Sequence, residues 1–196
     1  MGRIIKAFAV LQLCLLLVAC GTAPEKRAPA SAIEIAELAQ EIMALGPNVD
    51  PNEARRAARI SYERTRELAI QYQITDPPLV HNTKVNMGLK PRGLCWHWAE
   101  DMEARLNEEE FETLVMYRAI ANADNAWRID HSTAIIAAQG TGMYDGIVLD
   151  PWRTGGTLFW DNVRDDTRYE WVQRELVLDA KRRQLIAEGK IPAPAG

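Results

Sequence analysis

The stretch GLCWHWAEDMEARL, residues 93–106, has the pattern of an amphipathic helix with a cysteine at its start. Its apolar positions recur at spacings of four, three and four residues, at Cys95, Ala99, Met102 and Leu106. The first turn of a helix has unpaired N–H groups and a positive dipole end, so a thiolate there is stabilised and reactive. We therefore expect an inward-facing Cys95 in the first turn, with Gly93 allowing a tight turn into the helix.

Three strand-like runs follow this helix. Residues 111–120 are rich in β-forming residues, residues 127–139 alternate in character, and residues 147–152 follow a glycine-rich turn. The alternation in the second run places four residues on one face, namely His131, Thr133, Ile135 and Ala137. A hairpin of the last two runs would place His131 beside Asp150, with both side chains facing the helix that carries the cysteine.

Thiol catalysis requires a nucleophile, a base within hydrogen-bond reach, and a carboxylate that orients the base. Cys95, His131 and Asp150 occur in that order, with separations of 131 − 95 = 36 and 150 − 131 = 19 residues. Two alternatives stay open on the residues alone. Cys95 can be a small buried hydrophobe, and His131 can be a core histidine with satisfied hydrogen bonds.

The segments GLCWHWAEDMEARL, DHSTAII and GIVLDPW together resemble the transglutaminase-like superfamily of the papain-like fold, which includes bacterial cysteine peptidases. The resemblance covers about residues 80–160. It implies an α+β fold in which the cysteine-bearing helix packs on a small antiparallel sheet. It also implies that Cys95 is the nucleophile, His131 the general base and acid, and Asp150 the residue that orients the histidine.

Acyl transfer also needs donors that stabilise an oxyanion. The N–H group of Cys95 is the natural first donor, and the resemblance implies a second, side-chain donor upstream. Asn82 and Asn86 are the candidates, because the more usual glutamine is absent nearby. Trp96 and Trp152 are candidates for substrate contact, although tryptophans at these positions can equally belong to the core or to the wall of a groove.

Other histidines and carboxylates fit the roles less well. His97 lies two residues from the cysteine, so on a helix it points roughly the opposite way and is expected to be a surface or supporting residue. His81 is expected in a loop with a structural role. Asp130 would face away from His131, and two further acids fall in expected loops, namely Asp124 and Asp145. A zinc site made of these residues lacks the usual spacing, so neither a metal nor a cofactor is predicted.

Helices are expected on both sides of this central region. Ser31 and Glu34 form a capping-box pattern ahead of an apolar helical stripe, which consists of Ile35, Leu38, Ile42 and Leu45. Asp50, followed by proline, is typical of the start of a second helix, which runs to about Tyr72. Residues 171–188 predict a charged C-terminal helix with three inward residues, Leu176, Ala180 and Leu185. Residues 31–188 are thus expected to form one domain, followed by a flexible tail at 189–196.

The N-terminus has the layout of a secretory signal, with basic residues before a short apolar run. The end of that run, LVACG, resembles the lipobox of bacterial lipoproteins, which implies cleavage after residue 19 and acylation of Cys20. The alternative is an ordinary signal peptide with an incidental cysteine. Gly21 resembles the pattern that allows export to the outer membrane, facing the periplasm. Residues 20–30 are then a flexible linker from the lipid to the domain.

Removing residues 1–19 takes away Arg3 and Lys6, so the mature net charge is 21 − 27 = −6. This balance argues against a nucleic-acid partner and against electrostatic binding to anionic lipid, so membrane attachment would rely on the acyl chains alone. Among the mature cysteines, Cys20 would carry lipid and Cys95 would have no internal disulfide partner.

Two functions from different classes are compatible with these observations. The first is acyl transfer through a thioester on a peptide or protein substrate, as hydrolysis of a peptide or isopeptide bond or as transfer to an amine. The second is a catalytically silent lipoprotein that uses the same groove to bind an envelope protein or glycan. The missing glutamine and the bulky Trp96 beside the nucleophile favour the second.

Overall fold

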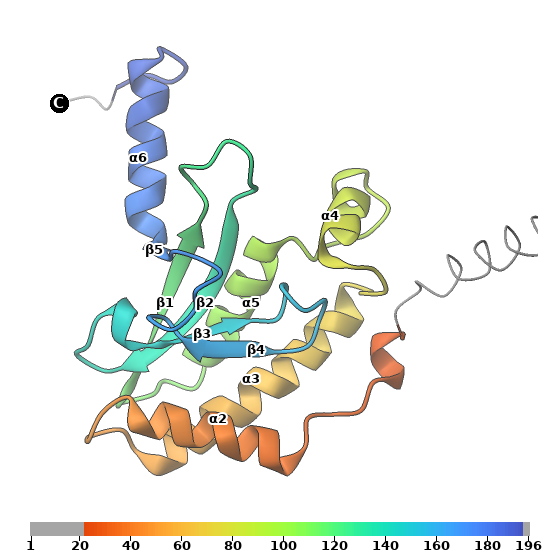
Figure 1. The fold of residues 1–196 in the computed structure, drawn as a ribbon, viewed down its shortest axis with the longest axis vertical. Helices are drawn as coiled ribbons and strands as arrows, with labels where there is room; N and C mark the ends of the chain where they lie inside the picture. Colours follow the sequence, from red (N-terminus) through yellow and green to blue (C-terminus); the bar gives the residue numbers. More distant parts are fainter. Residues whose placement is uncertain (1–21, 194–196) are drawn as a thin grey trace, which may run out of the picture.

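The structure is a computed structural model that describes residues 22–193 and has a mixed α+β fold (Figure 1). The expected signal peptide, the candidate lipidation site at Cys20 and the last three residues of the expected tail lie outside the described residues. The elements in chain order are η1 (Pro24–Lys26), α2 (Ala32–Ala44), α3 (Pro51–Gln71), α4 (Pro78–Asn86), α5 (Cys95–Asn107), β1 (Leu114–Ala121), β2 (His131–Ala138), η2 (Met143–Asp145), β3 (Ile147–Asp150), β4 (Phe159–Asn162), β5 (Val172–Gln173) and α6 (Arg174–Ala187).

The five strands form one antiparallel sheet in the order β4-β3-β2-β1-β5. β2 pairs with β1 along its whole length, and His131 lies opposite Ala121 at one end. β3 pairs with the other edge of β2, with Ile135 opposite Val148. Every residue of β2 is buried, which makes this strand the centre of the sheet.

The sheet separates two layers of packing. On one face, α2, α3 and α5 pack against the even-numbered residues of β2, as in the contact of Met102 with the cluster that contains Ala134 and Ile136. On the other face, Ile135 belongs to a smaller cluster closed by Tyr169 and by two further residues of the 163–171 segment, Val163 and Trp171. Because both faces are covered, the strand is apolar on both sides at most positions.

The predicted helix starts are confirmed at two positions. Ser31 caps α2 through a capping box with Glu34, and the Asp50 carboxylate accepts from the N–H groups of the first turn of α3. Within the described residues, no helix is long and apolar enough to cross a membrane.

Part of the predicted linker is docked on the domain instead of hanging free. Residues 24–26 form a short 3₁₀ helix, and Pro24 is buried. The Arg27 guanidinium donates to Gly155 O at 2.7 Å, and Arg66 donates to Glu25 O at 3.2 Å. Composition indicated flexibility here, but these two long-range hydrogen bonds hold the segment in place.

Two helices differ from their predictions. Residues 78–86 form α4, whereas the sequence predicted a loop there. α6 is present, but the three residues expected to face inward are exposed and Val177 is the buried one. Figure 1 shows α6 extending away from the sheet beyond its first turn, so most of its length has no partner element against which a face could be buried.

Candidate active site

Cys95 is the first residue of α5, and the chain before it is held by two histidines. The Nδ1 atom of His97 accepts from the N–H groups of Gly93 and Leu94 at 3.1 and 3.2 Å. Burial, together with the nearby Arg92 charge, lowers the pKa of His97, which keeps its ring neutral and able to accept. Of the two roles predicted for His97, the structure shows the supporting one, because the buried ring caps the start of the helix.

Gly93 is needed at its position for both conformation and space. Its φ angle is +123°, in the region that side chains rarely adopt. A Cβ atom there would lie 2.4 Å from His81 Nε2, and this same nitrogen lies 2.9 Å from Arg92 O. His81 therefore has the structural role that was predicted, although it lies on α4 and not in a loop.

The Cys95 thiol is free and almost enclosed, with 7% of the residue exposed. It donates to the backbone oxygen of Asp130 at 3.6 Å. Asp130 immediately precedes β2, so the start of α5 and the start of β2 meet at this point. The lone cysteine is thereby brought to the end of the strand that carries the candidate base.

His131 and Asp150 are joined directly in the interior. The Nε2 atom of His131 lies 2.6 Å from Asp150 Oδ2, and both side chains are 1% exposed. The other ring nitrogen, Nδ1, is buried and has no hydrogen-bond partner within the described residues. After Asp150, the Cys95 thiol is the neighbour that raises the pKa of this ring. One ring nitrogen is therefore fixed by a carboxylate and the other is left for the thiol.

These contacts set the charge of the pair. Burial alone lowers the pKa of His131, but the charge and hydrogen bond of Asp150, together with the Cys95 thiol, outweigh it and raise that pKa to about 9. Burial also raises the pKa of Asp150, and here His131 and Arg153 outweigh it and lower the pKa below the ordinary aspartate value. At neutral pH the site therefore holds a protonated imidazole beside a carboxylate.

The predicted strand face was correct for His131 and Asp150, but its orientation was wrong. The two residues do share a face, because the register of β2 and β3 continues to place Asp150 opposite Thr133. That face is turned away from α5 and toward the cluster closed by Tyr169 and Trp171, whose rings lie 4.6 and 5.4 Å from the imidazole. His131 meets the cysteine only because it is the first residue of its strand, where the helix start reaches the end of the sheet.

A buried ion network supports Asp150, and sequence reasoning missed it. Arg153 Nε donates to Asp150 Oδ2 at 2.9 Å, and its two terminal nitrogens donate to the carboxylate of Asp166 at 3.1 and 2.7 Å. Trp171 Nε1 donates to the same carboxylate at 2.9 Å. The only sequence signal was the short spacing between Asp150 and Arg153, which is three residues.

The residues predicted as oxyanion donors lie at different distances from the candidate site. The N–H groups of Cys95 and Trp96 have no acceptor within residues 22–193, as expected for a first helical turn. Asn82 reaches the site through Trp152, whose indole nitrogen donates to Asn82 Oδ1 at 3.0 Å. Asn86, in contrast, is exposed at the end of α4 and has no contact with the site.

The two candidate tryptophans lie in different places. Trp152 is buried and packs on the imidazole of His131 at 4.6 Å between ring centroids. Trp96 is half-exposed and packs at a tilt on His97, with ring centroids 3.8 Å apart, outside the cavity next to His131. Of the two, only Trp152 is placed to form the wall of a substrate site.

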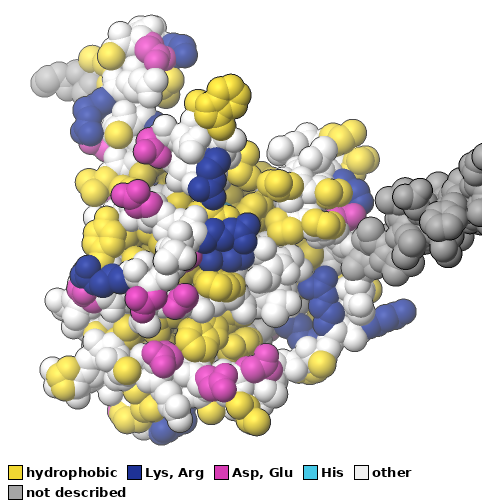
Figure 2. Space-filling view, in the orientation of Figure 1, with side chains coloured by type: hydrophobic (Ala, Val, Ile, Leu, Met, Phe, Trp, Pro, Cys, Tyr) yellow, Lys and Arg dark blue, Asp and Glu magenta, His cyan; other side chains and the backbone are white. Residues whose placement is uncertain are grey.

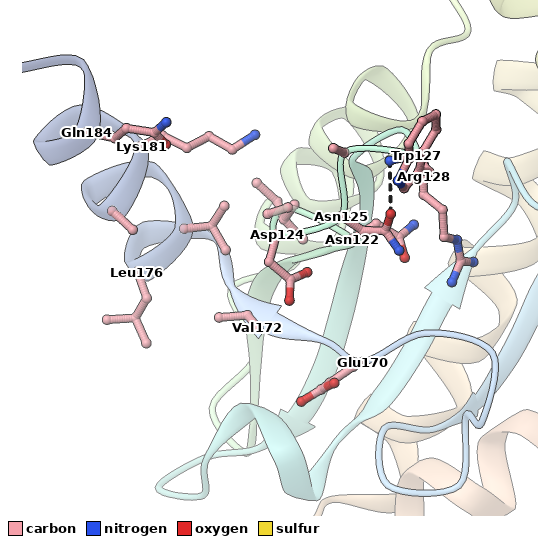
Figure 3. Close-up of a pocket in the computed structure, with 15 residues that line it drawn as sticks. Asn122, Asp124, Asn125, Trp127, Arg128, Glu170, Val172, Leu176, Lys181 and Gln184 are labelled. Carbon is pink, nitrogen blue, oxygen red and sulfur yellow. Dashed lines mark hydrogen bonds between the residues drawn. The ribbon is translucent and has the colours of Figure 1, made fainter. Parts of the chain in front are cut away.

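A cavity of about 490 Å³ opens beside His131, between α4 and the β1–β2 loop. Its wall includes Leu79 on one side, Trp127 and Arg128 on the other, and Trp152 and Tyr169 at its base. A larger cavity of about 920 Å³ lies on the far side of the same loop, against α6, and contains none of the three candidate catalytic residues (Figure 3). Of these two cavities, only the first is lined by His131, and neither is lined by Cys95 or Asp150.

The rival carboxylates are engaged elsewhere or exposed. Asp130 is exposed and contacts Lys181 of α6. Asp145 pairs with Arg164 at 2.8 Å on the surface, and Asp124 is exposed on the β1–β2 loop. Among the described residues, no three His, Cys, Asp or Glu side chains are grouped to hold a metal ion.

Comparison of the chain with protein-family models, with curated proteins and with solved structures finds no match.

Proposed function

We propose that this protein is a lipid-anchored envelope enzyme that transfers acyl groups through a thioester on Cys95, using a papain-like, transglutaminase-like core. The observation that carries the proposal is the state of His131. Its Nε2 atom is bonded to a buried carboxylate at 2.6 Å, and its Nδ1 atom is buried, unpartnered and next to a thiol at a helix start. This is the arrangement that a cysteine nucleophile needs.

The reaction follows from these positions. Cys95 Sγ forms a bond with the acyl carbon while its proton resides on Nδ1 of His131, and the N–H groups of the first turn of α5 stabilise the oxyanion. The bond to the leaving amine then breaks, and the amine takes the proton from His131. Water or a second amine then attacks the thioester carbon and gives a proton to the imidazole. The C–S bond breaks, and the released Cys95 sulfur recovers the shared proton from His131. Asp150 holds the ring in place throughout.

The anchor is proposed from the lipobox-like sequence before Cys20. Acylation of Cys20 would hold the domain at a bilayer surface on the periplasmic side. Mass spectrometry of the N-terminal fragment, expressed in a Gram-negative host, tests this directly. An unmodified Cys20, or cleavage at another residue, would contradict it.

The test of the enzyme uses the full chain with Cys14→Ser and Cys20→Ser, so that Cys95 is its only thiol. The rate of alkylation by iodoacetamide is measured between pH 5 and 9, alone and with His131→Ala or Asp150→Asn. We expect fast alkylation at neutral pH that falls by roughly tenfold or more in His131→Ala, because the imidazolium no longer stabilises the thiolate. Equal rates in all three proteins at every pH would contradict the proposal.

One observation favours the silent binding protein as a second candidate. The thiol donates to the Asp130 carbonyl, so in this conformation its hydrogen bond is made to the backbone and not to His131. A groove protein of this kind would bind envelope peptides or glycans without forming a thioester. Equal alkylation rates, combined with saturable binding of such ligands, would support it.

A further inference from the structure

The cavity beside His131 has an uneven distribution of charge. Three arginines line it, Arg128, Arg153 and Arg168, and no Asp or Glu side chain does. This contrasts with the whole chain, which has 27 acidic and 23 basic residues. Figure 2 shows Lys and Arg side chains among hydrophobic ones near the middle of the face that it presents.

Only two of the three arginines are available to a ligand. The positive charge of Arg153 is met by the carboxylates of Asp150 and Asp166 in the interior. Arg128 and Arg168 are both exposed, and neither forms an ion pair with a carboxylate in the described part of the chain. Figure 3 shows the Arg128 guanidinium directed away from α6, and Arg128 lines both the cavity beside α6 and the cavity beside His131.

Both Arg128 and Arg168 lie against Tyr169, which in turn packs on His131. The guanidinium carbons of Arg128 and Arg168 lie 5.4 and 5.6 Å from the centre of the Tyr169 ring. The same ring packs on the imidazole of His131 at 4.6 Å. The two arginines are thus separated from the candidate base by one aromatic ring. An arginine against an aromatic face keeps its planar donors free at the edge, where they match a carboxylate.

We propose that this cavity selects acyl donors that carry a carboxylate, such as a peptide with an acidic side chain beside the residue that is attacked. Arg128 and Arg168 would bind the carboxylate, and the exposed ring of Trp127 would cover the adjoining peptide. The inference rests on the proposed thioester function, because it concerns the substrate of the same site. It adds a substrate class that the Cys95, His131 and Asp150 constellation does not specify.

The experiment compares two probes that differ in one charge. These are acetyl-Glu-Ala chloromethyl ketone and acetyl-Gln-Ala chloromethyl ketone, each of which alkylates a thiol with loss of chloride. The full chain with Cys95 as its only thiol is used, and the site of alkylation is confirmed by mass spectrometry. At low ionic strength we expect the Glu probe to react about fivefold faster than the Gln probe, with the difference shrinking at high salt.

The variant Arg128→Gln/Arg168→Gln should bring this ratio to about one, chiefly by slowing the Glu probe. The matched control is Arg164→Gln/Arg183→Gln, which removes the same charge from exposed surface pairs outside the cavity and should keep the wild-type ratio. An unchanged ratio in the cavity variant, or an equal loss in the control, would overturn the proposal.

The two proposals fail in distinguishable ways. One outcome is that the rate of iodoacetamide alkylation is the same in the wild type and in His131→Ala, while the faster reaction of the Glu probe still depends on Arg128 and Arg168. In that case the thioester function is wrong, and the binding site for a carboxylate stands. If alkylation depends on His131 but the Glu and Gln probes react alike, the thioester function stands and the acidic substrate class is wrong.

Discussion

His131 and Asp150 meet at 2.6 Å in the interior of the protein, one from the first residue of β2 and the other from the last residue of β3. An isolated buried charge is costly, so this pair persists because each partner neutralises the other and Arg153 extends the network. The pairing has consequences for stability as well as for chemistry.

The first prediction concerns pH. The folded pKa of His131, about 9, is above the ordinary value of 6.5, so the protonated ring stabilises the fold fully below pH 6.5, and this contribution is lost as the pH rises through 9. The free energy of unfolding of the wild type, relative to His131→Gln, should therefore be greater at pH 6 than at pH 9.5 by up to about 3 kcal/mol. Urea unfolding at the two pH values measures it. A difference that does not change with pH would rule out a charged pair.

The second prediction concerns Arg153, whose side chain is 4% exposed. Replacing it with methionine leaves the carboxylates of Asp150 and Asp166 buried without their cation, which should cost about 3–5 kcal/mol of stability. The control is Arg164→Met, which breaks an exposed pair with Asp145 and should cost at most about 1 kcal/mol. Similar costs for the two variants in urea unfolding would mean that the buried network contributes little.

The third prediction concerns Gly93. Alanine there would bring its Cβ to 2.4 Å from His81 and strain a backbone with φ +123°, so the start of α5 must shift. We expect the Gly93→Ala variant to lose at least about 2 kcal/mol of stability and most of its Cys95 alkylation rate. Gly88→Ala is the control, because its φ is also positive, at +73°, but nothing lies within 4 Å. It should cost only about 1 kcal/mol and leave the alkylation rate intact.

The fourth prediction concerns His97 as a positioning residue. Removing its ring in His97→Ala leaves the N–H groups of Gly93 and Leu94 without acceptors, which should cost about 1–3 kcal/mol. Alkylation of Cys95 should slow, while the titration of His131 followed by NMR stays unchanged. Glutamine at this position of a helix can accept from the same N–H groups, so His97→Gln should recover most of the rate. Failure of Gln to rescue would indicate a different role for the ring.

The sequence predicts best where periodicity and caps coincide. The spacing of Cys95, Ala99, Met102 and Leu106 located α5 and the position of its thiol, and these residues are all buried. The alternation around His131 located β2, and the proline after Asp150 marked the end of β3. Each of these signals is local, so the sequence alone carries it.

Other features depended on contacts distant in the chain. α4 has nine residues, and its one buried side chain is His81. Because it has no apolar stripe, the hydrophobic pattern did not predict this helix. The partner of Arg153, Asp166, lies 13 residues away in a polar segment without periodicity. The face to which His131 points was misjudged because alternation specifies that two residues share a face, but not which layer covers it.

The docked segment around Arg27 limits where such an enzyme would work. Because Pro24 is buried and Glu25 O accepts a hydrogen bond from Arg66, only 24 − 20 = 4 residues join the body of the protein to Cys20. Even fully extended, four residues span at most about 14 Å. With acyl chains on Cys20, the domain would stay close to the bilayer surface. Bonds in more distant parts of the envelope would then not reach its candidate active site. Releasing the docked residues 24–27 would lengthen this tether without altering the candidate catalytic groups.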